Sequence, residues 1–257
     1  MKQTRDPRSR QQKFLKYFSL FVYLSLVGSI IFIIVRIFLA PASLPAGAGE
    51  GERLKSDYVL MLLQCILGVV VLMLPSILAK RFRLEIPSMM LILFVLFLYC
   101  AVYLGEVQDF YYKIANWDTI LHCFSGGMLG TLGFSVIALF NNSDRIPVNL
   151  SPIFVAFFAF CFAMMLGAIW EIYEFTIDGL MQLNMQKYAL ENGVALVGRA
   201  ALIDTMSDLI VDAVGAFVIA VIGYISTKYK KGWLEALIIT RRRDHADAKS
   251  TASGSER

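Results

Sequence analysis

Charged residues are scarce in this chain of 257 residues. Asp, Glu, Lys and Arg together make up 17% of it, below the roughly 25% of soluble domains, while hydrophobic residues make up 58%. So apolar a composition excludes a disordered chain and argues against a soluble globular protein. The 18 glycines and 7 prolines are too few for a collagen-like or low-complexity sequence. The composition therefore indicates an integral membrane protein.

Cysteine and histidine are also rare. The chain has 4 cysteines, all inside apolar segments, and none has the Cys-x-x-Cys spacing of a metal site. We therefore expect Cys65, Cys100, Cys123 and Cys161 to be small packing residues rather than a disulfide framework. Of the 2 histidines, His245 lies in the polar C-terminal tail, whereas His122 lies inside an apolar run.

The apolar residues form six runs, each long enough for a transmembrane helix of about 20 residues. The runs are apolar on all sides rather than alternating, which favours helices over barrel strands and predicts an all-α, polytopic membrane protein. The expected spans are 18–39, 58–79, 86–105, 118–140, 152–176 and 204–226. We expect a basic arm over 1–17 and a basic, partly disordered tail over 227–257 on either side of this six-helix domain.

Basic residues are distributed unequally between the two sides of the predicted bundle. Of the 24 Lys and Arg residues, 18 fall on the side that holds both termini and 5 on the opposite side. The positive-inside rule therefore predicts that both termini are cytoplasmic and that the protein lies in the cell membrane. Basic arms beside a span are typical of topology signals or lipid contacts, so no nucleic-acid partner is expected. The first span is longer than the core of a signal peptide, which indicates an uncleaved anchor.

Acidic residues gather at the predicted outer ends of spans four, five and six. Spacings of three, four and seven residues place the members of each group on one helical face. The groups are Asp118 with His122 and Ser125 in span four, Glu171, Glu174 and Asp178 in span five, and Asp204, Asp208 and Asp212 in span six. Ionisable groups are costly when they face lipid, so the sequence predicts a single polar site between these spans. Glycines such as Gly126 and Gly215 would allow the helices to approach, although packing alone also explains them.

These seven carboxylates need to be neutralised in a low-dielectric setting. The expected cationic partners His122, Arg199 and Arg36 are too few to balance them, so either protons or bound cations must complete the balance. Carboxylates with one imidazole suit a divalent Mg, Mn, Fe or Zn ion, and helical bundles build metal centres from such spacings. The expected ligands are His122, Glu171, Glu174 and Asp208, followed by Asp204 and Asp212.

Several of these residues have alternative interpretations. Asp118 could orient the His122 imidazole or bind the metal itself, and Asp118, His122 and Glu174 are the catalytic candidates. Asp118, Asp178 and Asp204 lie at predicted span ends, where a helix cap or a solvated interface residue is an equally good interpretation. Ser125, one turn from His122, is a weak candidate for a nucleophile.

These motifs resemble the YjdF-like family of uncharacterised bacterial inner-membrane proteins. The resemblance rests on Trp117-Asp118-x-x-x-His122-x-x-Ser125-Gly126, Trp170-Glu171-x-x-Glu174 and Asp204-Thr205-x-x-Asp208 followed by Gly215. It is strong over the second half of the chain and rests on hydropathy over the first three spans. It implies a multi-pass membrane fold and a set of polar motifs, without a substrate.

Three functions agree with this pattern. The first is a divalent-metal-dependent membrane enzyme, a hydrolase or transferase acting on a lipid-linked or envelope substrate at the outer face. The second is a cation or proton transporter, since acids inside spans mark ion pathways. The cytoplasmic halves of spans four to six carry no ionisable residue, however, so a complete ion path is not visible. The third is a non-catalytic membrane scaffold whose polar cluster only joins three helices.

Overall fold

A computed structural model describes residues 7–41, 53–141, 150–190 and 194–241. Six helical segments in these ranges are long and apolar enough to cross a membrane, which confirms the predicted all-α membrane fold. They are α1 (Pro7–Leu39), α2 (Lys55–Phe82), α3 (Ser88–Leu98) with its continuation η1 (Tyr99–Val107), α5 (Trp117–Asn141), α6 (Pro152–Met181), and α7 (Ile203–Lys228) preceded by the 3₁₀ turn η2 (Gly198–Leu202).

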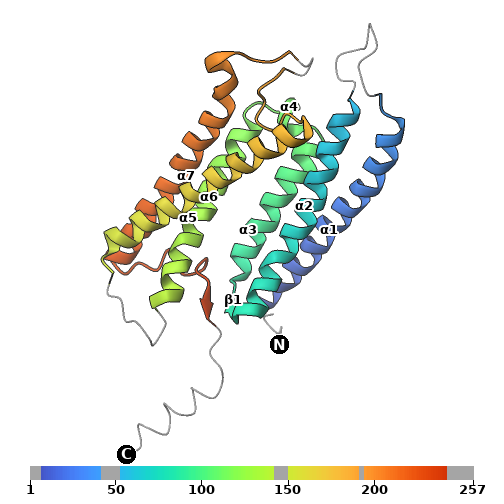
Figure 1. Ribbon diagram of the computed structural model, residues 1–257. Coiled ribbons are helices and arrows are strands. Elements are labelled where there is room, and N and C mark those ends of the chain that lie inside the picture. The colour runs from blue at the N-terminus through green and yellow to red at the C-terminus, as the bar shows by residue number, and fades with distance from the viewer. Residues whose placement is uncertain (1–6, 42–52, 142–149, 191–193, 242–257) are drawn as a thin grey trace, which may run out of the picture.

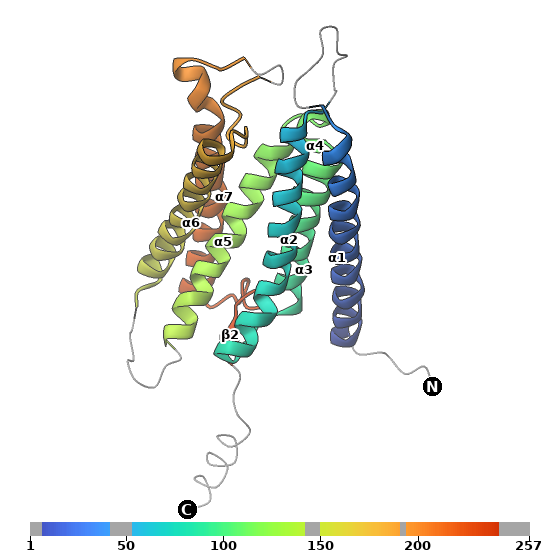
Figure 2. The ribbon, with the colours of Figure 1, turned by 45° about the vertical axis from the view of Figure 1, so that its right-hand side comes forward.

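The helices form two groups that lie beside one another (Figures 1 and 2). The N-terminal group consists of α1, α2, α3 and η1, and packs around a core that includes Val22, Leu26 and Cys65. The C-terminal group consists of α5, α6 and α7, and its core includes Phe134 and Ala159. Many large apolar side chains on both groups point outward, as expected for helices surrounded by lipid rather than water.

The two groups are joined at the end of the molecule where the described chain begins and ends, which we call the terminal end. Strand β1 (Leu84–Glu85), after α2, pairs antiparallel with β2 (Thr240–Arg241). The segment before β2 is tied to α5, because the backbone N–H of Ile239 donates to Ser135 Oγ at 3.1 Å. The opposite end, where α1 and α6 stop and α5 and α7 start, is the loop end (Figure 1).

Several elements extend beyond the expected spans. Helix α1 begins at Pro7, so residues 7–17 of the expected arm are helical and lead directly into the first span. Good helix formers follow Pro7 without a helix-breaking residue. Helix α6 continues to Met181 and ends where Gln182 adopts a left-handed conformation, with φ of 55°. In the expected tail, residues 227 and 228 complete α7 and residues 229–241 form the return segment that ends in β2. The predicted disorder beyond Arg241 concerns residues outside the described part of the chain.

The third span ends in a π-helix, which the apolar pattern did not predict. Element η1 extends the helix through Val107. The backbone N–H of Gln108 donates to the carbonyl of Tyr103, five residues earlier in the chain, at 3.0 Å. The indole N–H of Trp117, at the start of α5, donates to the Cys100 carbonyl in η1 at 3.3 Å. Short π-helical stretches are frequent at functional sites, and this one joins the two helix groups at the loop end.

Candidate metal centre

Helices α5 and α7 cross with their backbones in direct contact. A Cβ atom on Gly126 would overlap the backbone of Asp212, and one on Gly215 would overlap the carbonyl of Cys123. Helix α6 also approaches closely, because a Cβ atom on Gly167 would lie 2.7 Å from Asp212 Oδ2. Small residues at helix crossings permit such contacts in membranes. The crossing brings the polar faces of α5 and α7 together near the loop end.

Asp118, His122 and Asp208 converge at this crossing. The imidazole Nε2 of His122 lies 3.6 Å from Asp118 Oδ1 and 3.7 Å from Asp208 Oδ2. One potential ligand atom from each of the three residues lies within 4.8 Å of the other two. Two of the residues are one turn apart on α5 and the third lies on α7, so the group exists only because these helices cross.

The other imidazole nitrogen of His122 faces a second carboxylate. His122 Nδ1 is buried and lies 3.5 Å from Asp212 Oδ2, and no residue in the described ranges forms a hydrogen bond with it. The hydroxyl of Ser125 lies 3.0 Å from Asp212 Oδ1 and 2.8 Å from the His122 carbonyl, and its single proton can be donated to either. Metal-binding histidines commonly present their second nitrogen to a carboxylate in this way, which fixes the orientation of the ring.

Lys187, in the loop after α6, forms ion pairs with two carboxylates of the predicted site. Its Nζ donates to Asp118 Oδ2 and, at 2.9 Å, to Asp204 Oδ1. Burial lowers the pKa of Lys187, but Asp118 and Asp204 raise it by more, so the net pKa lies above the usual lysine value. Lys187 therefore stays charged and neutralises part of the cluster from the loop after α6.

The loop that carries Lys187 is held in place by acids of α6. Asp178 accepts backbone hydrogen bonds from Met185 at 2.8 Å and Gln186 at 3.0 Å. The amide of Gln186 donates to Thr205 Oγ1 at 3.0 Å and to Glu171 Oε2 at 3.4 Å. Asp178 thus has a structural role at the helix end, whereas Glu171 Oε1 is buried with no hydrogen-bond partner among the described residues. A cavity of about 520 Å³ lies against Glu171 and Thr205, with Ile172, Phe175 and Leu202 among its walls.

Two further polar residues approach the cluster from the N-terminal side. Glu106 of η1 lies near enough to Asp118 and Lys187 to interact electrostatically with both. Tyr111, in the short helix α4 (Phe110–Lys113), has its pKa raised well above the usual value by burial and then by Glu106 and Asp118. Sequence reasoning placed Glu106 in an outer loop, because the apolar run ends at Gly105 and only the π-helix reveals that the helix continues.

The structure distinguishes between the seven acids that the sequence grouped together. Asp118 and Asp208 share the convergence point with His122, Asp212 lies behind the imidazole, and Asp204 pairs with Lys187. Glu174 is 9% exposed and faces the same interior. The expected cations Arg36 and Arg199 do not serve this cluster, because Arg36 bonds to Tyr58 and Arg199 is exposed in η2. Sequence reasoning missed Lys187, which had no signal beyond its place in the loop at the same end.

Fold and site together define a multi-pass membrane protein with a buried carboxylate–histidine cluster at one end of the bundle. Residues 22–229 match the family described as "Predicted membrane protein (DUF2238)". The chain belongs to this family, which confirms the resemblance to a family of uncharacterised membrane proteins.

A curated relative matches part of the chain. A protein of Thermotoga maritima described as "Uncharacterized protein" is 31% identical over 123 residues, which are 47% of this chain and 54% of that protein. The chain therefore spans about half the length of the curated relative it matches. No solved structure matches the chain.

Proposed function

We propose that this protein is a divalent-metal-dependent membrane enzyme, a hydrolase or transferase whose substrate is lipid-linked or part of the cell envelope. The convergence of Asp118, His122 and Asp208 carries this proposal. Oxygen and nitrogen ligands bind metals such as zinc at about 2.0–2.2 Å, so two ligands of one ion lie roughly 3–4 Å apart. The two distances from His122 Nε2, 3.6 and 3.7 Å, agree with this separation.

The donor set suits catalysis better than a structural role. Three protein ligands leave coordination positions open for water and substrate, whereas structural zinc sites are closed by four ligands, usually with thiolates. A metal at this position would activate water or polarise a phosphoryl or carbonyl oxygen. Glu174 interacts electrostatically with His122, Asp118 and Asp208, and is our candidate for the general base.

The surroundings of the site support a lipid-linked substrate. The cavity beside Glu171 has the apolar side chains Ile172, Phe175 and Leu202 in its wall. An acyl or isoprenoid chain would lie against these side chains while its polar group approached the carboxylate cluster. The excess of Lys and Arg on the terminal side favours cytoplasmic termini, so that the loop end and its site would face the outside of the cell membrane.

Metal content tests the first half of this proposal. We expect the purified chain to bind about one Mn²⁺ or Zn²⁺ per molecule, and Asp208→Asn to weaken binding at least about 100-fold, because a ligand of a three-residue set is lost. Asp57→Asn is the matched control, since Asp57 lies at the same end but accepts its bonds from Leu54 N–H and the Ser56 hydroxyl at the start of its own helix. Metal binding that survives Asp208→Asn unchanged would show that the acids are neutralised by protons instead.

Product formation tests the second half. We would incubate the protein with a lipid extract of its host membrane, with and without the metal, and follow lipid-linked species by mass spectrometry. A species that is consumed only by metal-loaded protein, and not by Glu174→Gln, supports catalysis. If no species changes, and metal-loaded proteoliposomes show a cation flux that Asp208→Asn abolishes, the site belongs to a transporter and the enzyme proposal is wrong.

A further inference from the structure

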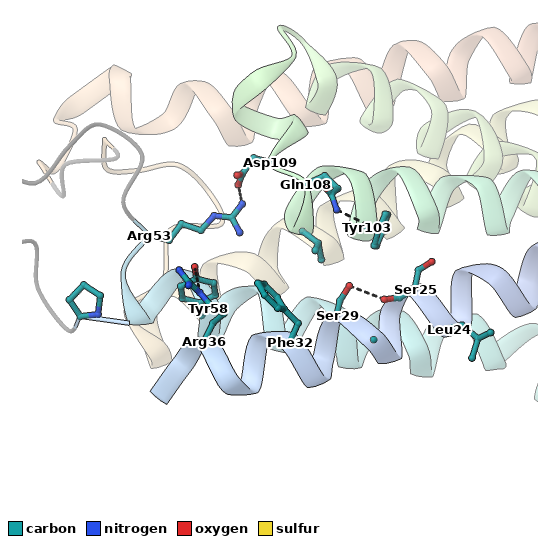
Figure 3. Close-up of a pocket in the computed structure, with 13 residues that line it drawn as sticks. Leu24, Ser25, Ser29, Phe32, Arg36, Arg53, Tyr58, Tyr103, Gln108 and Asp109 are labelled. Carbon is teal, nitrogen blue, oxygen red and sulfur yellow. Dashed lines mark hydrogen bonds and ion pairs between the residues drawn. The ribbon is translucent and has the colours of Figure 1, made fainter. Parts of the chain in front are cut away.

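A second polar cavity lies in the N-terminal helix group, and none of its lining residues belongs to the carboxylate cluster (Figure 3). It has a volume of about 1020 Å³ and runs along α1 from Leu24 to Arg36, between α1, α2 and η1. At about 1.5 Å per residue this stretch of α1 is about 18 Å long. That length is close to one leaflet of the hydrocarbon core, which is about 15 Å deep.

The loop end of this cavity carries an arginine, Arg36, in the last turn of α1. The Nε of Arg36 donates to Tyr58 Oη at 3.0 Å, and the guanidinium carbon lies 5.3 Å from the centre of the Tyr58 ring. These contacts fix the guanidinium in place. Its two terminal amino groups have no hydrogen bond or ion pair with another residue in the described ranges. An arginine near the end of a span extends toward the lipid headgroups, where a phosphate can meet its charge.

Among the described residues, the neighbouring charges leave the cavity positive. Arg53 forms an ion pair with Asp109, and the Nζ of Lys113 lies 3.5 Å from the same carboxylate. Asp109 is therefore already shared by two cations and does not compensate Arg36. Figure 3 shows Arg36, Arg53 and Tyr58 gathered at one end of the cavity, and Leu24 at the other. Charge is thus confined to the end that lies at the level of the lipid headgroups.

The deeper part of the cavity suits an apolar occupant. The hydroxyls of Ser25 and Ser29 donate to carbonyls of their own helix, Phe21 at 2.9 Å and Ser25 at 2.8 Å, so neither requires a polar ligand. In the described part of the chain, no atom beyond the neighbouring backbone of α1 lies within 4 Å of the position where a Cβ on Gly28 would stand, which leaves open space in the wall. Phe32 and Leu24 add apolar surface above and below this opening.

We propose that this cavity binds one phospholipid, with the lipid phosphate on the Arg36 guanidinium and an acyl chain running along α1 past Gly28 toward Leu24. A planar guanidinium binds phosphate oxygens in pairs, and this geometry gives strong charge-assisted hydrogen bonds. A free phosphate ion would occupy only the loop end, whereas a lipid fills the full length of the cavity. The proposal does not depend on the metal centre and stands if that centre proves to be empty of metal.

Lipid binding to the full chain in detergent tests this proposal. The probes are dioleoylphosphatidylglycerol, dioleoylglycerol, which lacks the phosphate, and inorganic phosphate, with native mass spectrometry and thermal unfolding as readouts. We expect phosphatidylglycerol to be retained and to raise the melting temperature. Arg36→Gln should weaken its apparent affinity about tenfold, because hydrogen bonds to a charged group are lost. Arg81→Gln, on an exposed arginine at the terminal end of α2, is the matched control and should bind as the wild type does.

A second variant keeps the test decisive if Arg36→Gln folds poorly. Gly28→Leu fills the open wall without changing charge, and should also displace the lipid. Equal lipid affinity in both variants and the wild type would overturn the proposal. So would equal protection by dioleoylglycerol, which would show that the phosphate is not recognised, or by inorganic phosphate, which would show that the acyl chain is not.

Discussion

The two helix groups of this protein contain helices of similar length and hydrophobicity, but their ionisable residues have different surroundings. In the C-terminal group, α5 and α7 touch at Gly126 and Gly215, and the acids around this crossing are packed against one another and against His122. In the N-terminal group, the wall around Gly28 is open, and Arg36 lines a cavity, where it is hydrogen-bonded to Tyr58. Close helix packing thus produces a closed acidic cluster, whereas loose packing leaves a basic cavity that a ligand can enter.

The largest expected effect comes from a substitution at the close crossing of α5 and α7. Gly126→Val would drive the new side chain into the backbone of Asp212, and we expect it to lower the free energy of unfolding by at least about 3 kcal/mol, because a packed backbone cannot relax cheaply. Gly28→Val is the matched control in the N-terminal group, where open space should keep the change within about 0.5 kcal/mol. Reversible unfolding in detergent measures both. Equal stability of the two variants would contradict the contrast between the groups.

The sequence predicted the fold because a membrane imposes one dominant rule. Apolar runs of sufficient length must be helices, and their number and approximate positions follow from hydropathy alone. Helical spacing also predicted that Asp118 shares a face with His122, and that Asp204, Asp208 and Asp212 share another. Whether these faces bind a metal stays a prediction, since spacing on single helices does not identify the ligand that fills the space between them.

The parts that the sequence did not predict depend on contacts between distant segments. Lys187 reaches the cluster because Asp178 and Gln186 fold the loop after α6 back over the helices. Glu106 joins the site because a π-helix carries the third span two residues beyond the end of its apolar run, through Val107. The separate roles of Asp118 and Asp212 arise from the depth at which α5 and α7 cross, which is set by backbone contact at two glycines.

A second, smaller effect concerns the lysines at the loop end. In the metal-free protein, Lys187→Met would leave Asp118 and Asp204 without their shared cation, and we expect a loss of about 1–2 kcal/mol in unfolding free energy because two partly buried carboxylates lose their partner. Lys113→Met, in the exposed pair with Asp109, should cost less than about 0.5 kcal/mol. Thermal unfolding before and after adding Mn²⁺ gives the comparison.

The stabilisation of each variant by Mn²⁺ shows whether Lys187 shares the acidic cluster with a metal ion or is its resident counterion. A divalent cation near Asp118 would restore charge balance, so Mn²⁺ should stabilise Lys187→Met by more than it stabilises the wild type. Mn²⁺ should leave Lys113→Met no different from the wild type. If Mn²⁺ has no effect on either variant, Lys187 is the resident counterion of a structural cluster, and the acidic group resembles the scaffold alternative rather than a metal centre.

The smallest expected effect separates two serines that look alike in sequence. Both Ser29 and Ser125 lie within a span and close to carbonyls of their own helix, but only Ser125 also reaches a carboxylate, Asp212 Oδ1 at 3.0 Å. Ser125→Ala should weaken Mn²⁺ affinity about threefold, since one hydrogen bond that supports the carboxylate behind His122 is worth about 0.5–1.5 kcal/mol. Ser29→Ala should leave Mn²⁺ affinity unchanged. A calorimetric titration resolves this difference, and an unchanged affinity in Ser125→Ala would mean that Asp212 holds His122 without help from the hydroxyl.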